Sequence, residues 1–309
     1  MDNKRLVANL LLLLTAAIWG FAFVAQRIGS QFVGAFTFNG IRFALGALSL
    51  IPLIIYFDKK KKSQSSDDSE SKIEVTAKKT IISGIVVGMV LYAGATLQQV
   101  GLIYTTAGKA SFITGLYMVF VPLMGIFLKQ KIGKNSWIGV ALAVVGLYLL
   151  SVNEDFSMGY GDILEVIGAI FWAIHILTID NFAKKIDPLK LSCIQFATCS
   201  FLSLVTALLF EQITMSGISK ALIPILYGGL LSVGVAYTLQ VVAQKNAKPS
   251  HAAIILSMES VFGAIGGALL LSESMSSRGY IGCALILGGI LVSQIKSSTE
   301  NCSEGAVNL

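Results

Sequence analysis

Long uncharged runs fill this 309-residue chain almost from end to end, and they limit the folds that it can adopt. A membrane-spanning helix needs about 20 mostly apolar residues, since each residue advances the helix by about 1.5 Å. Runs of about that length without a charged residue cover 6–26, 80–108, 110–128, 135–153, 191–210, 221–244 and 279–295. Three further spans, 32–57, 162–182 and 249–271, contain Arg42, His175 and Glu259. The sequence therefore predicts an all-α integral membrane protein with ten transmembrane helices.

The second five spans repeat the first five. Short matches occur in the same order at offsets of 153, 142 and 143 residues: AAIW at 16–19 with AIFW at 169–172, IRFA at 41–44 with IQFA at 194–197, TLQ at 96–98 with 238–240, VF at 119–120 with 261–262, and IGVAL at 138–142 with IGCAL at 281–285. Because five is an odd number of spans, the second repeat is expected to be inverted relative to the first. We expect the repeats to cover 6–153 and 160–296, with a cytoplasmic polar loop at 58–79 and a disordered tail at 297–309.

Lysine and arginine residues indicate the orientation, since cytoplasmic loops of membrane proteins are enriched in both. With the N-terminus inside, the inner segments hold 18 of these residues and the outer loops hold 4, while Arg42 lies within a span. We therefore expect both termini in the cytoplasm and the protein in the plasma or inner membrane. The formal net charge of +6 then reflects topology and attraction to anionic lipid at the cytoplasmic face, not binding of nucleic acid. These features are compatible with a monomer.

Two ionisable residues fall near the middle of predicted spans. Arg42 lies about ten residues into one span and Glu259 about eleven residues into another. A charge in the hydrocarbon region costs at least about 2.5–3.5 kcal/mol, so such residues usually face a cavity or a partner. One interpretation places both at a central aqueous cavity, with Arg42 binding a substrate anion and Glu259 a cation or a coupling proton. The other interpretation makes Arg42 and Glu259 a structural ion pair in which each residue neutralises the charge of the other.

Neutral polar and aromatic side chains accompany these charges at helical spacing. Asn39 shares a face with Arg42, and Tyr237 shares one with Gln240. Such groups either supply hydrogen bonds to a polar solute or hold helices together, and His175 either relays protons or packs. The candidates for a substrate cavity are Trp19, Asn39, Arg42, Tyr92, Gln98, Gln99, Trp172, His175, Tyr237, Gln240 and Glu259. Segments 137–152 and 279–295 are almost wholly apolar and are expected to brace the other helices.

The sequence carries none of the common hydrolytic or nucleotide-binding motifs. It lacks H-E-x-x-H, G-x-x-x-x-G-K-[ST] and G-x-S-x-G, and no cysteine spacing suggests a metal site. We therefore expect no catalytic residues, no metal and no cofactor. The absence of an ATP site favours a secondary transporter of a small-molecule solute over a pump. The alternative is an intramembrane enzyme or a channel.

Four segments carry a family resemblance: WGFAF at 19–23, IRFALGAL at 41–48, LQQVGLIYTTAGKASFITGLYMVFVPLMG at 97–125 and HAAIILSMESVFGAIGGALLLSE at 251–273. They resemble the EamA family of the drug/metabolite transporter superfamily. The resemblance implies a ten-helix fold of two inverted five-helix repeats around a central cavity. It also implies alternating access, often in efflux of amino acids or other metabolites. Family members often have Glu-Pro where this chain has Glu259-Ser260, so we expect no proline bend there.

Overall fold

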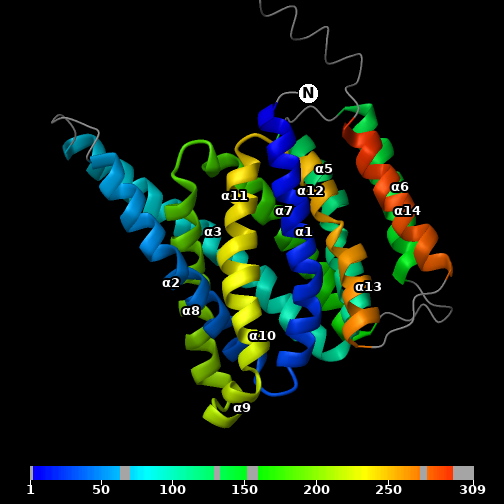
Figure 1. The fold of residues 1–309 in the computed structure, drawn as a ribbon, viewed down its shortest axis with the longest axis horizontal. Helices are drawn as coiled ribbons and strands as arrows, with labels where there is room; N and C mark the ends of the chain where they lie inside the picture. The colour runs from blue at the N-terminus through cyan, green and yellow to red at the C-terminus, as the bar shows by residue number, and fades with distance from the viewer. Residues whose placement is uncertain (1–2, 63–69, 129–132, 152–158, 272–276, 295–309) are drawn as a thin grey trace, which may run out of the picture.

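The computed structural model describes residues 3–62, 70–128, 133–151, 159–271 and 277–294, and these residues form helices and short connections without a β-strand. The helices are α1 (Asn3–Gly29), α2 (Ala35–Lys62), α3 (Glu70–Tyr104), α4 (Ala107–Gly115), α5 (Tyr117–Phe127), α6 (Lys134–Ser151), α7 (Tyr160–Ala183), α8 (Pro188–Phe210), α9 (Met215–Lys220), α10 (Leu222–Leu226), the π-helical segment η1 (Tyr227–Tyr237), α11 (Thr238–Gln244), α12 (Pro249–Leu256), α13 (Glu259–Leu270) and α14 (Ser277–Gln294). Most of them run side by side in one bundle (Figure 1). The tail, 297–309, and residues 63–69 of the predicted polar loop lie outside the described residues, whereas α2 and α3 extend as helices into the rest of that segment, 58–62 and 70–79.

Eight of the described helical segments are long and apolar enough to cross a membrane. They are α1, α2, α3, α4 with α5, α7, α8, α10 through α11, and α12 with α13. The remaining apolar helices, α6 and α14, contain 18 residues each and pack along each other at one side of the bundle (Figure 1). The fold is therefore that of an all-helical, multi-pass membrane protein. The total of ten spans stays a prediction.

Glycines bring α6 and α14 into backbone contact. A Cβ atom added to Gly146 would lie 2.5 Å from the carbonyl oxygen of Gly282, and one added to Gly289 would lie 2.6 Å from that of Gly139. Small residues allow membrane helices to approach closely enough for extensive dispersion contact. The pair is thus joined by backbone packing over much of its length.

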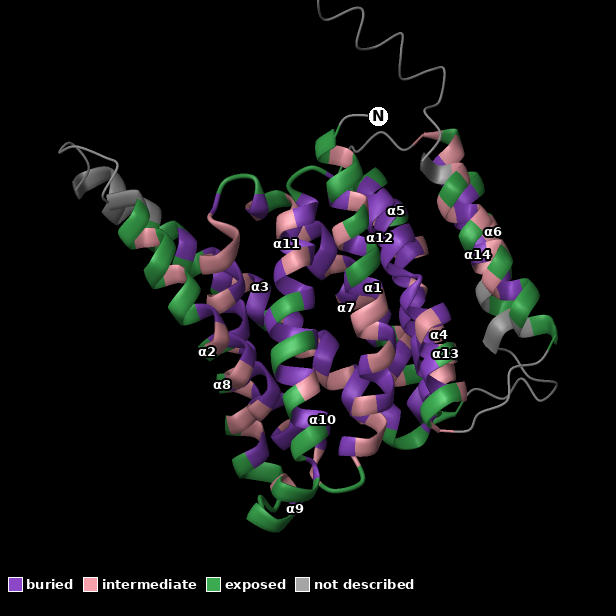
Figure 2. Ribbon diagram, viewed as in Figure 1, coloured by how far each residue is buried: buried purple, intermediate pink, exposed green. Residues whose placement is uncertain are grey.

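The distribution of apolar and polar side chains fits a bilayer environment. Large apolar side chains such as Leu208, Phe210 and Phe127 project outward, with 74%, 77% and 87% of their surface exposed. Polar and ionisable residues, among them Arg42 and Glu259, are buried between the helices instead. Figure 2 shows buried positions concentrated on the faces that the helices turn toward one another. Burial of charge inside and exposure of hydrocarbon outside are expected for a protein whose solvent is lipid.

Two spans are interrupted at matching positions. The break between α4 and α5 falls at Leu116, and the break between α12 and α13 falls at Ser257 and Met258. The second break occurs without a proline, because Ser260 stands where family members often have one, so the helix is interrupted even though no proline bend is present. Ser257 explains the break in part, because its hydroxyl donates to the carbonyl oxygen of Ile254 at 2.7 Å and its own carbonyl accepts from the Ser260 N–H. Glu259 thereby becomes the first residue of a helix.

A carboxylate joins the two sequence halves at the face of the bundle opposite the start of α1. Glu211, which follows the end of α8, accepts hydrogen bonds from the backbone N–H groups of Phe36 and Thr37 at 2.9 and 2.8 Å, and from the Thr37 hydroxyl at 2.6 Å. These N–H groups belong to the first turn of α2, which has no partner for them within the helix. The contact fixes the start of α2, the helix that carries Arg42.

Candidate functional site

A narrow cavity lies among the helices of the bundle. Its volume is about 30 Å³ in this conformation. Its walls come from α1, α2, α3, α4, α5, α7, η1, α11 and α13. The lining residues are Trp19, Ala22, Phe23, Gln26, Arg42, Gln98, Thr114, Tyr117, Trp172, His175, Ile176, Ser232, Tyr237, Gln240 and Glu259. In the described part of the chain, α6 and α14 contribute none of them.

Eight of the eleven candidates from the sequence line this cavity. Two of the others support it from behind: the Asn39 side-chain oxygen Oδ1 accepts from Arg42 Nε at 2.9 Å, and the Gln99 side-chain amide donates to the Gln26 backbone carbonyl oxygen at 3.3 Å. Tyr92 lies elsewhere, because its hydroxyl is 2.7 Å from that of Thr206 on α8. The structure thus places Tyr92 in a contact between helices and outside the cavity lining.

Arg42 is held by neutral groups. Only 1% of its surface is exposed, and its guanidinium carbon lies 4.9 Å from the ring centre of Phe43 and 5.6 Å from that of Phe38. These distances are those of cation–π contacts, which stabilise a cation without neutralising it. Nε donates to Asn39, whereas the buried Nη2 has no protein partner. Arg42 therefore retains a donor for an anionic group.

Glu259 is the acidic counterpart, with 3% of its surface exposed and no protein partner for Oε1. Among the described residues, the structure contains no ion pair between Glu259 and Arg42, although both line the same cavity. The structural pair considered from the sequence is therefore not formed in this conformation. Two opposite charges face one enclosed space without neutralising each other, an arrangement that is costly unless a ligand or water completes it.

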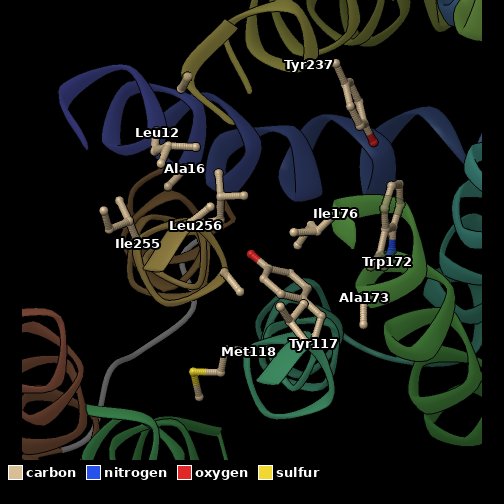
Figure 3. Packing of buried hydrophobic residues seen from close by; sticks show 14 of the residues in the cluster. Leu12, Ala16, Tyr117, Met118, Trp172, Ala173, Ile176, Tyr237, Ile255 and Leu256 are labelled. Atoms are coloured by element: carbon tan, nitrogen blue, oxygen red, sulfur yellow. The ribbon is translucent and has the colours of Figure 1, made fainter. Parts of the chain in front are cut away.

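An aromatic group forms one wall. The ring centres of Trp172 and Tyr237 lie 6.0 Å apart in a stacked arrangement, and His175 meets both at 5.8 and 6.1 Å, nearly perpendicular. Trp19 closes the group with its ring centre 4.5 Å from that of Tyr237. Figure 3 shows Trp172 and Tyr237 projecting from different elements, with Ile176 and Ala173 nearby. The rings thus form an apolar wall with polar atoms at its edges.

His175 is oriented by a residue of the neighbouring helix. Its Nε2 lies 2.9 Å from the Gln195 amide oxygen on α8, and its buried Nδ1 has no protein partner. Trp19 donates from Nε1 to the Ser232 carbonyl oxygen at 3.3 Å, whereas Trp172 Nε1 has no protein partner. The histidine and Trp172 thus each offer one polar atom in the buried interior.

Several lining residues were missed by reasoning from the sequence. Gln26, Thr114, Tyr117 and Ser232 line the cavity, and the Tyr117 hydroxyl points into the space near Ile176 and Leu256 (Figure 3). A signal for Tyr117 was available, because it matches Glu259 at the repeat offset of 142. Ser232 could not be found in this way, since it enters the lining from a π-helical segment that changes which side chains face inward.

The lining contains five pairs at the offsets at which the sequence halves match. At 153, Trp19 corresponds to Trp172, Ala22 to His175 and Phe23 to Ile176; at 142, Gln98 corresponds to Gln240 and Tyr117 to Glu259. Tryptophan and glutamine are the same in both members of their pairs. The histidine and the carboxylate of these pairs, His175 and Glu259, occur in the second half, and Arg42 of the first half corresponds to Gln195. The tryptophan and glutamine residues of the lining therefore occur at matching positions in both sequence halves, whereas Arg42, His175 and Glu259 have no counterpart of the same type.

A polar cluster lies on the side of the cavity away from the start of α1. Lys109 forms an ion pair with Asp162 at 2.6 Å, and Asp162 also accepts from the Thr105 hydroxyl at 3.0 Å. The Lys109 ammonium group therefore joins α4 to α7. Among the described residues, no group of three or more His, Cys, Asp or Glu side chains could hold a metal ion.

These features define a multi-pass membrane protein whose helices enclose a polar and partly charged cavity, the general plan of a membrane transporter. The chain belongs to the EamA-like transporter family, whose model matches residues 6–152 and again 159–294.

Individual relatives agree with this assignment. An uncharacterized transporter of Archaeoglobus fulgidus is 31% identical over 294 residues, which cover 95% of this chain and 87% of the relative. The uncharacterized transporter YoaV of Bacillus subtilis is 25% identical over 89% of this chain and 92% of its own. One crystal structure has the same fold, with a TM-score of 0.73 and 16% identity over 93% of this chain and 96% of that one. The protein is therefore a transporter-family membrane protein.

Proposed function

We propose that this protein is a secondary transporter that moves a small polar organic solute across the membrane by alternating access. The observation that carries the proposal is the enclosed cavity in which Arg42 and Glu259 face the same space without forming an ion pair. A purely structural role would favour mutual neutralisation of such buried charges. A ligand that bears both charges would complete them.

The proposed substrate is an amino acid or a related zwitterionic metabolite. Its carboxylate would accept from Arg42 Nη2, and its ammonium group would donate to Glu259 Oε1, because each atom lacks a protein partner. The side chain would contact the rings of Trp19, Trp172 and Tyr237. Gln98 and Gln240 add amide groups that hydrogen-bond without introducing charge.

Alternating access requires contacts that close each end of the bundle in turn, and polar contacts occur at both ends. Near the start of α1, Arg5 Nη2 lies 3.0 Å from His251 Nδ1, and His251 Nε2 lies 3.2 Å from the Ser136 hydroxyl. At the opposite end, Lys109 pairs with Asp162. We propose that these two sets open and close reciprocally. The narrowness of the cavity supports a carrier over a channel, which would need a continuous wide path.

The proposed arrangement comprises ten spans in two inverted repeats, with both termini in the cytoplasm and efflux from the plasma or inner membrane. The distribution of lysine and arginine supports the orientation. The five lining pairs support the repeat, because inverted repeats place the substrate site where they meet.

The test is an untargeted comparison of metabolites inside and outside cells that overproduce the wild-type protein, the Arg42→Ala variant or neither. We expect zwitterionic metabolites to fall inside and rise outside only with the wild type. Identical profiles in all three strains would contradict transport of this class. Uptake of the identified metabolite into proteoliposomes should then saturate and show counterflow, which separates a carrier from a channel.

A further inference from the structure

A second buried carboxylate, Glu165, lies beside the cavity and is used by none of the contacts described above. It is on α7, one turn along from Asp162, and none of its surface is exposed. The Thr114 hydroxyl donates to its Oε2 at 3.1 Å, whereas Oε1 has no protein partner. A glutamate so deeply buried normally has a cation beside it, because an isolated charge is strongly disfavoured away from water.

The surroundings of Glu165 contain no such cation among the described residues. Lys109 of α4 is bound by Asp162, and Glu165 appears in no ion pair. The two charged groups that act on it electrostatically are themselves acidic, namely Asp162 of α7 and Glu259 of α13.

The other helices packed against α7 do not supply one. Beside Glu165, α3 presents Gly101, and Gln98 of α3 reaches it only through Thr114. The only titratable side chain of α5, Tyr117–Phe127, is that of Tyr117; α11 has none in its described length, and His251 of α12 is bound to Arg5 near the start of α1. A fixed negative charge here would therefore be repelled by its neighbours and left without compensation.

A hydrogen-bonded path connects Glu165 to the cavity. The Gln98 amide donates to the Thr114 hydroxyl at 3.2 Å, and the same hydroxyl donates to Glu165. Both Gln98 and Thr114 line the cavity, as does Glu259. The carboxyl group is thus one hydroxyl away from the space in which the substrate is proposed to bind.

We propose that Glu165 is a proton-binding site that exchanges a proton with the cavity during the transport cycle. In the uptake step, a hydronium ion in the cavity gives its proton to the carboxylate, which leaves a neutral carboxylic acid and a water molecule. Release is the reverse, so the charge of the site changes by one in each direction. This inference rests on the proposed transport function, and it leaves Glu259 for the cationic group of the substrate.

Infrared difference spectroscopy of the purified protein in lipid tests the site without any substrate. At mildly acidic to neutral pH we expect a carbonyl band of a buried carboxylic acid that disappears in Glu165→Gln. The band should shift in Thr114→Val, because the hydrogen bond to the carboxyl group is lost, and it should fade reversibly at alkaline pH. Asp180→Asn is the matched control on the same helix and should leave the band unchanged, since Asp180 is paired with Lys184 at 2.8 Å and takes no part in the path to the cavity.

Three outcomes would overturn the proposal. A band of equal intensity in wild type and Glu165→Gln would mean that Glu165 is ionised throughout. A Glu165 band that persists unchanged at every pH would make the group a permanent hydrogen-bond donor and not an exchanging site. Loss of the band when Na⁺ is added at constant pH would assign the site to a metal cation instead. None of these results depends on whether the metabolite comparison succeeds, so failure of this site and failure of transport are distinguishable.

Discussion

At the scale of single residues, the binding of an anionic group by Arg42 depends on how the guanidinium group is positioned. Its guanidinium lies against Phe38 and Phe43 and is oriented by Asn39, so its position is fixed by neutral groups. Lysine has a flexible stem and a point charge, and it cannot reproduce a planar group that stacks and donates at once. The role of this residue therefore depends on the guanidinium shape as well as on its charge.

Replacement of Arg42 should strongly reduce transport without unfolding the protein. We expect Arg42→Ala to lower the transport rate by at least about tenfold, because a charge-assisted hydrogen bond contributes about 1.5–3 kcal/mol. Arg42→Lys should recover only a small part. Transport in proteoliposomes is the measurement, with size-exclusion chromatography of the detergent-solubilised protein as the folding control. Normal transport by the alanine variant would make Arg42 an incidental buried charge.

Glu259→Gln should separate substrate binding from proton exchange. The amide keeps the shape of the carboxyl group but cannot compensate an ammonium group, so KM for a zwitterionic substrate should rise by about tenfold or more. The response of transport to an imposed pH gradient should remain, since the proton is assigned to Glu165. Unchanged KM with loss of the pH response would instead give the coupling proton to Glu259.

The sequence identified most single residues of the cavity because they are conspicuous in an apolar span. Arg42, His175 and Glu259 stand out for that reason, and eight of eleven candidates line the cavity. Glu165 was missed because it lies near the beginning of its span. A charged residue at that position can equally well be interpreted as lying at the membrane surface. Tyr92 was misplaced because helical periodicity gives the face shared by residues but not which neighbour that face meets.

At the scale of helices, the contact between α1 and α13 sets the position of Glu259. A Cβ atom on Gly20 would lie 2.7 Å from both the Glu259 carbonyl oxygen and the Gly263 nitrogen, which are backbone atoms and cannot give way without moving the helix. The break before Glu259 lies beside this close contact and next to the local hydrogen bond of the Ser257 hydroxyl, and no sequence motif indicated either.

Gly20→Ala should therefore destabilise the protein and impair transport. Overpacking of this kind typically costs about 1–3 kcal/mol, so we expect a lower Tm in a thermal unfolding measurement. Gly288→Ala is the matched control, because a Cβ atom there meets nothing within 4 Å. Equal melting temperatures for the two variants would show that α1 and α13 adjust without cost.

Accessibility of substituted cysteines should distinguish lining helices from bracing helices. In a background without the native cysteines, Gln98→Cys on α3 and Gln240→Cys on α11 should react with a water-soluble thiol reagent, whereas positions along α14 should not. Substrate should protect both reactive positions. A labelled stripe along α14 would rule out a cavity confined to the central helices.

At the scale of the whole molecule, orientation follows from where the basic residues lie. Reporter fusions at Lys62, Asp155 and Lys296 should read cytoplasmic, external and cytoplasmic, because each is separated from the next by an odd number of predicted spans. An external signal at Lys62 would reverse the proposed orientation and exchange the two ends of the bundle.

The unequal distribution of charge between matched positions has a further consequence for recognition. If both halves had kept the same residues, the site would look alike from either direction, and a ligand could lie in it either way round. With arginine on one side of the site and glutamate on another, a molecule with a negative end and a positive end fits in only one orientation. Duplication would thus have produced the cavity. Later divergence of a few side chains would have made its two sides different, so that the site distinguishes the two ends of a ligand.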